Sequence, residues 1–395
     1  MRRQRGSFSI ATTALAALVV TGCVAGPAPV TIEREPFRPD TAMMAVPVEG
    51  MLLPYALDGL RVIDPEWVLP AQGRDGVLLS ASEQGGLLEY TALDSDGTAL
   101  WAAQRPASCT GFLVTVDASG RALAVLTDID STTDAVAATT ATAVDLLTGE
   151  HVWGPVEVPG PLGGIGLVFA STPRGVIGSA GPATVLDAST GEVALEELDG
   201  RRVLGELRGT ALVVEGTELL AVSTTNGATL WRVEAEYLGI APAELAIVTA
   251  RSGADLADDL VLLEPDGVTS ERVLLELSTG EVRARGLDDA LTDALSGITV
   301  VRDAVRLSAV DAEGQTVWSE PIELDTFFAA AGNALLYLRH EQSVVVRNVQ
   351  TGAIAEGYEP AASGTIVLPR RFTIQGAAMV EVGQRELMVT TTPAD

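Results

Sequence analysis

The chain has 395 residues with 53 acidic side chains against 25 arginines, and its formal net charge is −28 at pH 7. So acidic a surface excludes a general affinity for nucleic acid or for anionic lipid headgroups. No lysine occurs anywhere in the sequence, which excludes chemistry that needs a lysine nucleophile.

The N-terminus has the order of residues found in secretory signals. Three arginines precede a short apolar run at 10–20, which is too short to span a bilayer permanently. The sequence Val-Thr-Gly-Cys at 20–23 resembles a bacterial lipoprotein processing site. We therefore expect residues 1–22 to be a signal peptide and Cys23 to carry the lipid, which anchors the mature protein without a spanning segment.

Residues 23–50 contain five prolines and show no clear periodicity, which predicts an extended tether between the lipid and a folded domain. Removal of residues 1–22 leaves 22 arginines against 53 acids, a formal charge of −31. Cys109 is then the only other cysteine, so no intrachain disulfide can form, and we interpret it as a small buried side chain.

Residues 51–395 repeat one pattern seven times: an apolar strand, an Asp-like residue, and a Thr-Gly or similar turn, often followed by Trp. The repeat glycines are spaced by about 42 residues, the period of propeller blades. They are Gly97, Gly149, Gly191, Gly227, Gly280, Gly314 and Gly352. Four tryptophans lie four residues after a repeat glycine, namely Trp101, Trp153, Trp231 and Trp318.

Each copy of the repeat can be assigned to strands and a turn of one blade. Its apolar half is the third strand of a four-stranded blade, and its glycine takes the positive φ of a tight turn into the fourth strand. Asp145, Asp187 and Asn348 are placed to accept hydrogen bonds from the turn amides. The tryptophans are expected to fill the wedge between neighbouring blades.

The two ends of the chain decide the number of blades. Three strand candidates follow the last repeat, at 365–368, 372–382 and 386–391, and a spare strand lies upstream at 59–67. Pairing the N-terminal strand with the C-terminal ones completes a further blade and removes exposed sheet edges. We therefore predict an all-β fold, a single propeller of eight blades, with seven as the alternative.

The repeat resembles that of PQQ-like, or quinoprotein-type, β-propellers, and the copy from Asp145 to Trp153 matches it in full. That family includes quinone-dependent dehydrogenases and cofactor-free lipoproteins such as BamB. The lipoprotein site and the single-domain length make this chain more similar to the second group, without evidence of the same role. The resemblance thus implies a propeller with no cofactor.

Few residues are candidates for catalysis or for metal binding. His151 and His340 lie in different repeats, no nucleophile elbow or phosphate-binding loop occurs, and a vicinal disulfide of the quinoprotein type is impossible. Two acidic segments contain oxygen ligands of the kind calcium prefers, but neither copies the 12-residue calcium loop. They are Asp128–Asp134, with Asp128, Asp130 and Asp134, and the loop with Asp255, Asp258 and Asp259.

We therefore expect that the protein is not an enzyme and has no metal site. We expect a monomeric, extracytoplasmic propeller that is anchored to a bacterial membrane and binds an envelope protein or polymer as a scaffold. A quinone- or calcium-dependent oxidoreductase and a sensor of carbohydrates or other small ligands are the alternatives. Because Asp128, Asp130 and Asp134 extend the loop between the second and third strands, the face with the interblade loops is the first candidate for a partner surface.

Overall fold

The computed structural model describes residues 32–39, 42–107, 111–130, 138–170, 181–197, 200–248, 256–265, 271–341, 343–361, 363–383 and 385–394. The chain divides into two compact units, Met1–Ile32 and Glu33–Asp395. Only Ile32 of the first unit belongs to the described residues, so the expected signal peptide and Cys23 lie outside them. In the described part no helix has the length and apolar character needed to cross a membrane.

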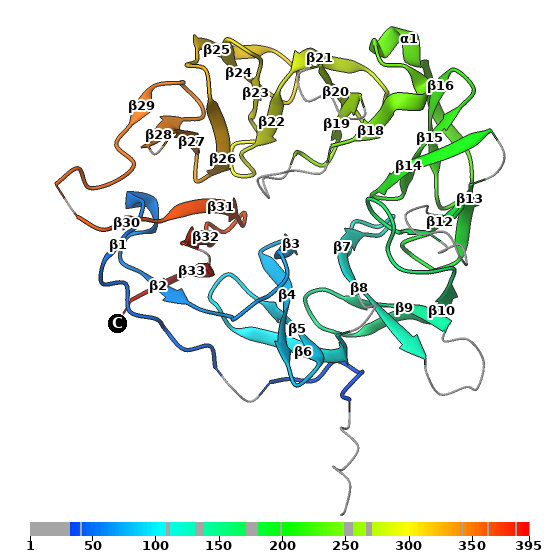
Figure 1. The fold of residues 1–395 in the computed structure, drawn as a ribbon, viewed down its shortest axis with the longest axis horizontal. Coiled ribbons are helices and arrows are strands. Elements are labelled where there is room, and N and C mark those ends of the chain that lie inside the picture. The colour runs from blue at the N-terminus through cyan, green and yellow to red at the C-terminus, as the bar shows by residue number, and fades with distance from the viewer. Residues whose placement is uncertain are drawn as a thin grey trace, which may run out of the picture. The chain divides into compact units, whose positions relative to one another are not determined.

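The second unit is a ring of eight antiparallel sheets, so the prediction of an eight-bladed propeller is confirmed (Figure 1). Blades 1 to 3 follow one another in the chain. Blade 1 consists of β3 (Gln72–Arg74), β4 (Val77–Gln84), β5 (Leu87–Leu93) and β6 (Ala99–Pro106). Blade 2 consists of β7 (Phe112–Val116), β8 (Ala122–Asp130), β9 (Ala138–Asp145) and β10 (His151–Val158). Blade 3 consists of β11 (Val168–Ala170), β12 (Ala183–Leu186) and β13 (Val193–Glu196).

Blades 4 to 7 have four strands each. Blade 4 consists of β14 (Arg201–Leu207), β15 (Thr210–Glu215), β16 (Glu218–Ser223) and β17 (Thr229–Glu234). Blade 5 consists of β18 (Leu245–Ile247), β19 (Leu260–Pro265), β20 (Arg272–Glu276) and β21 (Val282–Leu287). Blade 6 consists of β22 (Asp289–Thr292), β23 (Thr299–Arg302), β24 (Arg306–Val310) and β25 (Thr316–Pro321). Blade 7 consists of β26 (Thr326–Gly332), β27 (Leu335–His340), β28 (Ser343–Asn348) and β29 (Ile354–Ala355).

Both ends of the chain build blade 8. Its strands are β31 (Leu368–Phe372), β32 (Ala378–Val382), β33 (Arg385–Pro393) and, as the outer strand, β2 (Leu60–Ile63). The antiparallel pairing of β2 with β33 closes the ring. The inner strand of this blade begins later than expected, because β30 (Thr365–Ile366) leaves the blade and pairs in parallel with β1 (Met51–Leu52).

Two details depart from a uniform blade. In blade 3 the innermost position is held by one bridge between Leu162 and Phe169, because the glycines at 163, 164 and 166 interrupt a regular strand there. The helical segments are single turns between elements: α1 (Ala235–Leu238), η1 (Tyr55–Leu57) and η2 (Pro242–Glu244).

The repeat tryptophans lie between blades. Trp153 is 6% exposed, and its Nε1 donates to Ala188 O at 2.7 Å in the repeat turn of the next blade. A Cβ added to Gly191 of that turn would stand 2.5 Å from the Trp153 ring. The same donor and glycine contacts recur from Trp101 to Leu146 O and Gly149, from Trp231 to Leu277 O and Gly280, and from Trp318 to Val349 O and Gly352.

The turns themselves are held by Asx side chains. Asp145 Oδ1 accepts the amides of Leu147 and Thr148, at 3.1 and 2.9 Å. Asp187 and Asn348 accept the corresponding amides of their own turns. All seven repeat glycines have a positive φ, between 70° and 79°, which explains why glycine recurs at these positions.

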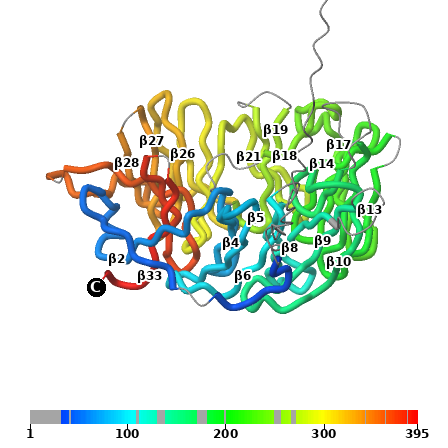
Figure 2. Tube along the Cα trace, turned by 60° about the horizontal axis from the view of Figure 1, so that its bottom comes forward, coloured from blue at the N-terminus to red at the C-terminus, as the bar shows by residue number. Residues whose placement is uncertain are grey.

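Most of the described part of the predicted tether is bound to the ring. Phe37 exchanges both backbone hydrogen bonds with Ala102 of β6, and Gln104 N donates to Glu33 O at 2.7 Å. Arg34 Nε forms an ion pair with Asp128 at 2.6 Å. Figures 1 and 2 show this dark blue segment beside β6. Residues 33–37 of the expected extended tether are therefore docked on the ring, because Phe37 pairs with blade 1 and Arg34 with blade 2.

A second stretch of the tether lies along blade 8, where Val46 N donates to Val62 O at 2.9 Å. The apolar side chains of Met43 and Val46 pack against the core clusters of that blade. Because these apolar residues are interleaved with prolines, the composition of 23–50 suggests an extended spacer while the individual side chains still dock.

We expect Asp128→Asn to loosen the docked N-terminal segment. The substitution removes the charge that Arg34 pairs with, so the amides of Ala102 and Gln104, which donate to Phe37 O and Glu33 O, should exchange hydrogen faster. Measurement of the hydrogen-exchange rates of these two amides tests this prediction. Glu215→Gln, which breaks the surface pair with Arg201, is the control and should leave both amides unchanged. Unchanged exchange in Asp128→Asn would show that backbone pairing alone holds the segment.

Candidate functional site

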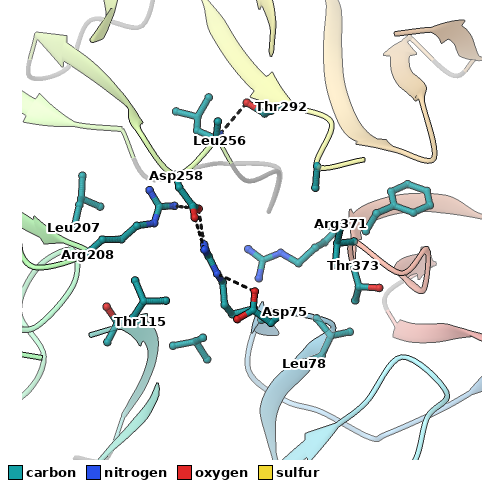
Figure 3. A pocket seen from close by; sticks show the side chains of 18 of the residues that line it. Asp75, Leu78, Thr115, Leu207, Arg208, Leu256, Asp258, Thr292, Arg371 and Thr373 are labelled. Carbon is teal, nitrogen blue, oxygen red and sulfur yellow. Dashed lines mark hydrogen bonds and ion pairs between the residues drawn. The ribbon is translucent and has the colours of Figure 1, made fainter. Parts of the chain in front are cut away.

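A cavity of about 530 Å³ lies at the centre of the ring, where the inner strands of the blades converge (Figure 3). It is lined from β3, β7, β14 and β31 and by the turns that follow several inner strands. In a four-stranded meander these turns lie at the same end of the ring as the repeat glycines. The cavity therefore opens at the end opposite to the interblade loops.

An ion pair crosses this cavity between opposite blades. Arg74 of blade 1 donates from both terminal nitrogens to the two carboxylate oxygens of Asp258 in blade 5. Arg208 of blade 4 also reaches Asp258 Oδ1, at 2.8 Å, and Arg74 Nε lies 3.4 Å from Asp75 Oδ1. Figure 3 shows Arg208 and Asp258 meeting in the cavity, with Asp75 on its opposite side. One carboxylate thus links three blades.

The ionisation of Asp258 follows from these contacts. Partial burial favours the neutral acid, but the hydrogen bonds from Arg74 and the charges of Arg208 and Arg74 outweigh it and hold the pKa of Asp258 below its usual value. The carboxylate is therefore charged at neutral pH, and its pairing with arginine persists into mildly acidic solution.

Glu206, at the wall of the cavity, is a different kind of acid. It is 1% exposed, and its two oxygens accept the amides of Leu167 and Gly209 at 3.0 and 2.7 Å. Burial raises the pKa of Glu206 above its usual value, although both amide bonds and the charge of Arg208 act in the opposite direction. Its oxygens join the first turns of blades 3 and 4 at the cavity wall.

We expect Asp258→Asn to destabilise the ring at neutral pH, because Arg74 and Arg208 then lose the shared carboxylate that lies between their two positive charges. Since the folded pKa of Asp258 is depressed, its contribution is present above the unfolded pKa and is lost as pH falls through the folded pKa. Urea midpoints at pH 7 and at strongly acidic pH check this, and the two proteins should converge in acid. Glu236→Gln on the exposed part of α1 is the control, and a difference that does not depend on pH would contradict the assignment.

The described acids of the two segments singled out from the sequence have separate partners. Asp258 binds the arginines of the cavity, and Asp259 accepts hydrogen bonds from the amide and hydroxyl of Ser278. Asp128 lies in β8 with its side chain 14% exposed, and its carboxylate is engaged by Arg34, with Arg105 Nε at 3.6 Å. Asp134, Asp255 and the side chain of Asp130 lie outside the described residues. Among the described residues no group of three or more His, Cys, Asp or Glu is arranged to hold a metal ion.

The two histidines are in separate places. His151 Nε2 lies 2.9 Å from Gly154 O on the outer strand of blade 2. His340 Nδ1 lies 3.1 Å from Thr326 Oγ1, and its Nε2 lies 3.1 Å from Glu323 Oε2. Cys109 is not among the described residues. The histidines thus act as hydrogen-bonding groups of their own blades.

A second feature, which the sequence reasoning missed, lies on the face with the interblade loops. Val305, Leu324 and Phe327 are 61%, 73% and 53% exposed. Val305 belongs to the turn between β23 and β24, and Leu324 to the connection from blade 6 to blade 7. Phe327 is the second residue of β26 itself. Ile322 N donates to Val305 O at 2.9 Å, which holds the two loops together. We call Val305, Leu324 and Phe327 the Leu324 patch.

A hollow of about 370 Å³ adjoins the Leu324 patch and is lined by five acids and three arginines. All three arginines are engaged: Arg272 with Glu264 at 2.9 Å, Arg302 with Asp288 at 3.6 Å, and Arg370 with Glu381. The guanidinium of Arg302 also lies 5.1 Å from the centre of the Phe327 ring. In the sequence this feature is represented by Leu324 between two acids, Glu323 and Asp325, a pattern that does not by itself indicate a surface.

No protein-family model and no curated protein matches the chain. Solved structures match it at low identity. BamB from Moraxella catarrhalis has 13% identity and a TM-score of 0.38, over 91% of this chain and 99% of that one. Sqt1 of Saccharomyces cerevisiae has 9% identity and a TM-score of 0.41, over 90% and 100%. The uncharacterized protein lmo1340 of Listeria monocytogenes has 9% identity and a TM-score of 0.39, over 86% and 92%.

Proposed function

We propose that this protein is a lipid-anchored, extracytoplasmic propeller that binds another protein of the bacterial envelope as a non-catalytic scaffold. The observation that carries the proposal is the Leu324 patch. Large apolar side chains gathered on one face of a soluble domain, between loops held by a rigid ring, are typical of a surface that another protein covers.

The course of the N-terminal segment also supports a partner surface on the face with the interblade loops. From Phe37 to Glu33 the chain runs along β6 towards the interblade loops. On the way, the side chain of Arg34 forms its ion pair with Asp128. Cys23 is ten residues before Glu33, and a chain spans at most about 3.5 Å per residue. A lipid on Cys23 would therefore keep Glu33 within about 35 Å of the membrane surface.

Two experiments test the proposal. Labelling of cells with a fatty acid analogue should mark the protein and not Cys23→Ala, and only the unmodified sequence should fractionate with membranes. Affinity capture from detergent-solubilised membranes should recover one envelope protein that is lost with Leu324→Ser and retained with Leu147→Ser. Leu147 is the matched control, since it is 59% exposed on the repeat turn of blade 2 at the opposite end of the ring. Equal recovery by both variants would remove the Leu324 patch from the proposal.

The central cavity favours a second candidate, the binding of a small anionic ligand such as an acidic sugar. Although the protein is strongly acidic, four arginines and three acids line this cavity. Arg371 extends into it and donates to Ala71 O at 3.1 Å (Figure 3). A rise in Tm with glucuronate and not with glucose, absent from Arg371→Gln, would support this function, and no rise with any acidic sugar would argue against it.

A further inference from the structure

We infer that the Leu324 patch binds a protein segment that carries apolar and cationic side chains together. This inference rests on the proposed function and names the chemistry of the partner. Its starting point is the composition of the surface, in which Val305, Leu324 and Phe327 are the apolar centre and carboxylates form the surroundings.

The apolar part requires an apolar counterpart. Each of the three residues is more than half exposed. Val305 and Leu324 come from two loops joined by the bond between Ile322 N and Val305 O, and Phe327 comes from the start of β26. Leu324 and Phe327 line a hollow in the surface, and Val305 directly follows Ala304, which also lines it. Burying Leu324 alone against a partner would strengthen binding about tenfold or more, at the usual value of buried apolar surface.

The charged part selects cations. The three arginines that line the hollow are each paired with a carboxylate of the protein, as described above. Glu323, whose side chain is 82% exposed, and Asp325 flank Leu324 and project at the surface. The hollow therefore presents an excess of negative charge, which attracts lysine or arginine of a partner and repels anionic polymers and anionic headgroups.

The backbone at this point adds support for a preformed surface. Asp325 has a φ of +62°, a conformation that non-glycine residues adopt rarely. The Asp303 carboxylate accepts the amides of Val305 and Arg306, at 2.9 and 2.8 Å, and so fixes the neighbouring turn. Both loops that carry the Leu324 patch are thus held in place before any partner arrives, which lowers the entropic cost of binding.

The test uses the full mature chain in detergent and a fluorescent peptide in which leucine and arginine alternate. We expect saturable binding that weakens with salt, and about tenfold weaker binding to Leu324→Ser. The pair Glu323→Gln with Asp325→Asn should weaken binding at low salt and flatten its salt dependence. Asparagine is chosen because it tolerates the positive φ of Asp325. Leu147→Ser should bind as the unmodified protein does.

Three results would overturn the inference. One is equal binding of a peptide with glutamate in place of arginine, and another is unchanged binding by both Leu324→Ser and Val305→Ser. The third is Leu324-dependent binding to phosphatidylcholine vesicles, which would make the patch a membrane contact. If the peptide fails while crosslinks from position 324 to an envelope protein persist in cells, the scaffold stands and only the inferred chemistry is wrong. If the peptide does not bind and no crosslink forms in cells, both the inference and the proposed scaffold function are wrong.

Discussion

Gly280→Ala is expected to destabilise the propeller by roughly 2–5 kcal/mol, because two costs coincide at this turn. The φ of +76° is unfavourable for alanine, at about 1–2 kcal/mol. In addition, the new Cβ would stand 2.7 Å from the Trp231 ring of the preceding blade, and such overpacking costs roughly 1–3 kcal/mol. Urea unfolding checks the total.

Gly227→Ala separates the two costs. Gly227 occupies the same turn of blade 4 with a φ of +70°, but nothing lies within 4 Å of an added Cβ, since the preceding blade has Leu195 where others have Trp. We expect only the backbone cost there, about 1–2 kcal/mol. In a Trp231→Leu background the excess cost at Gly280 should disappear. Equal effects at Gly280 and Gly227 would show that the tryptophans do not fix the packing of the blades.

Ile63→Ala is expected to cost about 2–5 kcal/mol, the usual range for truncating a buried isoleucine. Ile63 is fully buried in β2, the strand that completes blade 8, and it packs against the Gly97 turn of blade 1. It therefore stabilises both the closure of the ring and the contact between the last and first blades. Thermal or urea unfolding measures the effect.

The matched control is Ile354→Ala. Ile354 also belongs to the outer strand of its blade, β29, but it is 73% exposed, so a change within about 0.5 kcal/mol is expected. If Ile63→Ala were as mild as this control, the N-terminal strand would contribute little to the stability of the ring.

The repeat made most of the fold predictable. A glycine at a positive φ, an Asx residue before it and a tryptophan after it are local requirements of one turn, so they recur in the sequence wherever the turn recurs. The closing of the ring followed from a count of strands, because β2 has no partner unless it joins β33. Blade 3 was less predictable, since a single bridge at Leu162 leaves no strand pattern.

The contacts around the candidate sites could not be predicted in the same way. Arg74 and Asp258 lie 184 residues apart on opposite blades, and nothing local to either residue indicates the other. The docking of 33–37 was hidden by a proline-rich composition, which describes the average of a segment and not the fit of Phe37 or Arg34. Leu324 was overlooked because one apolar residue between acids is ordinary in a sequence, and only its 73% exposure beside Val305 makes it a surface.

The most direct test of a binding scaffold is photo-crosslinking in living cells from position 324. The chain has no lysine for amine-reactive reagents, so a photoreactive amino acid is placed at Leu324 and, as control, at Leu147 on the opposite end of the ring. We predict one discrete adduct with an envelope protein from position 324, reduced in Cys23→Ala and absent from position 147. No adduct at 324, or the same adduct from both positions, would contradict the account.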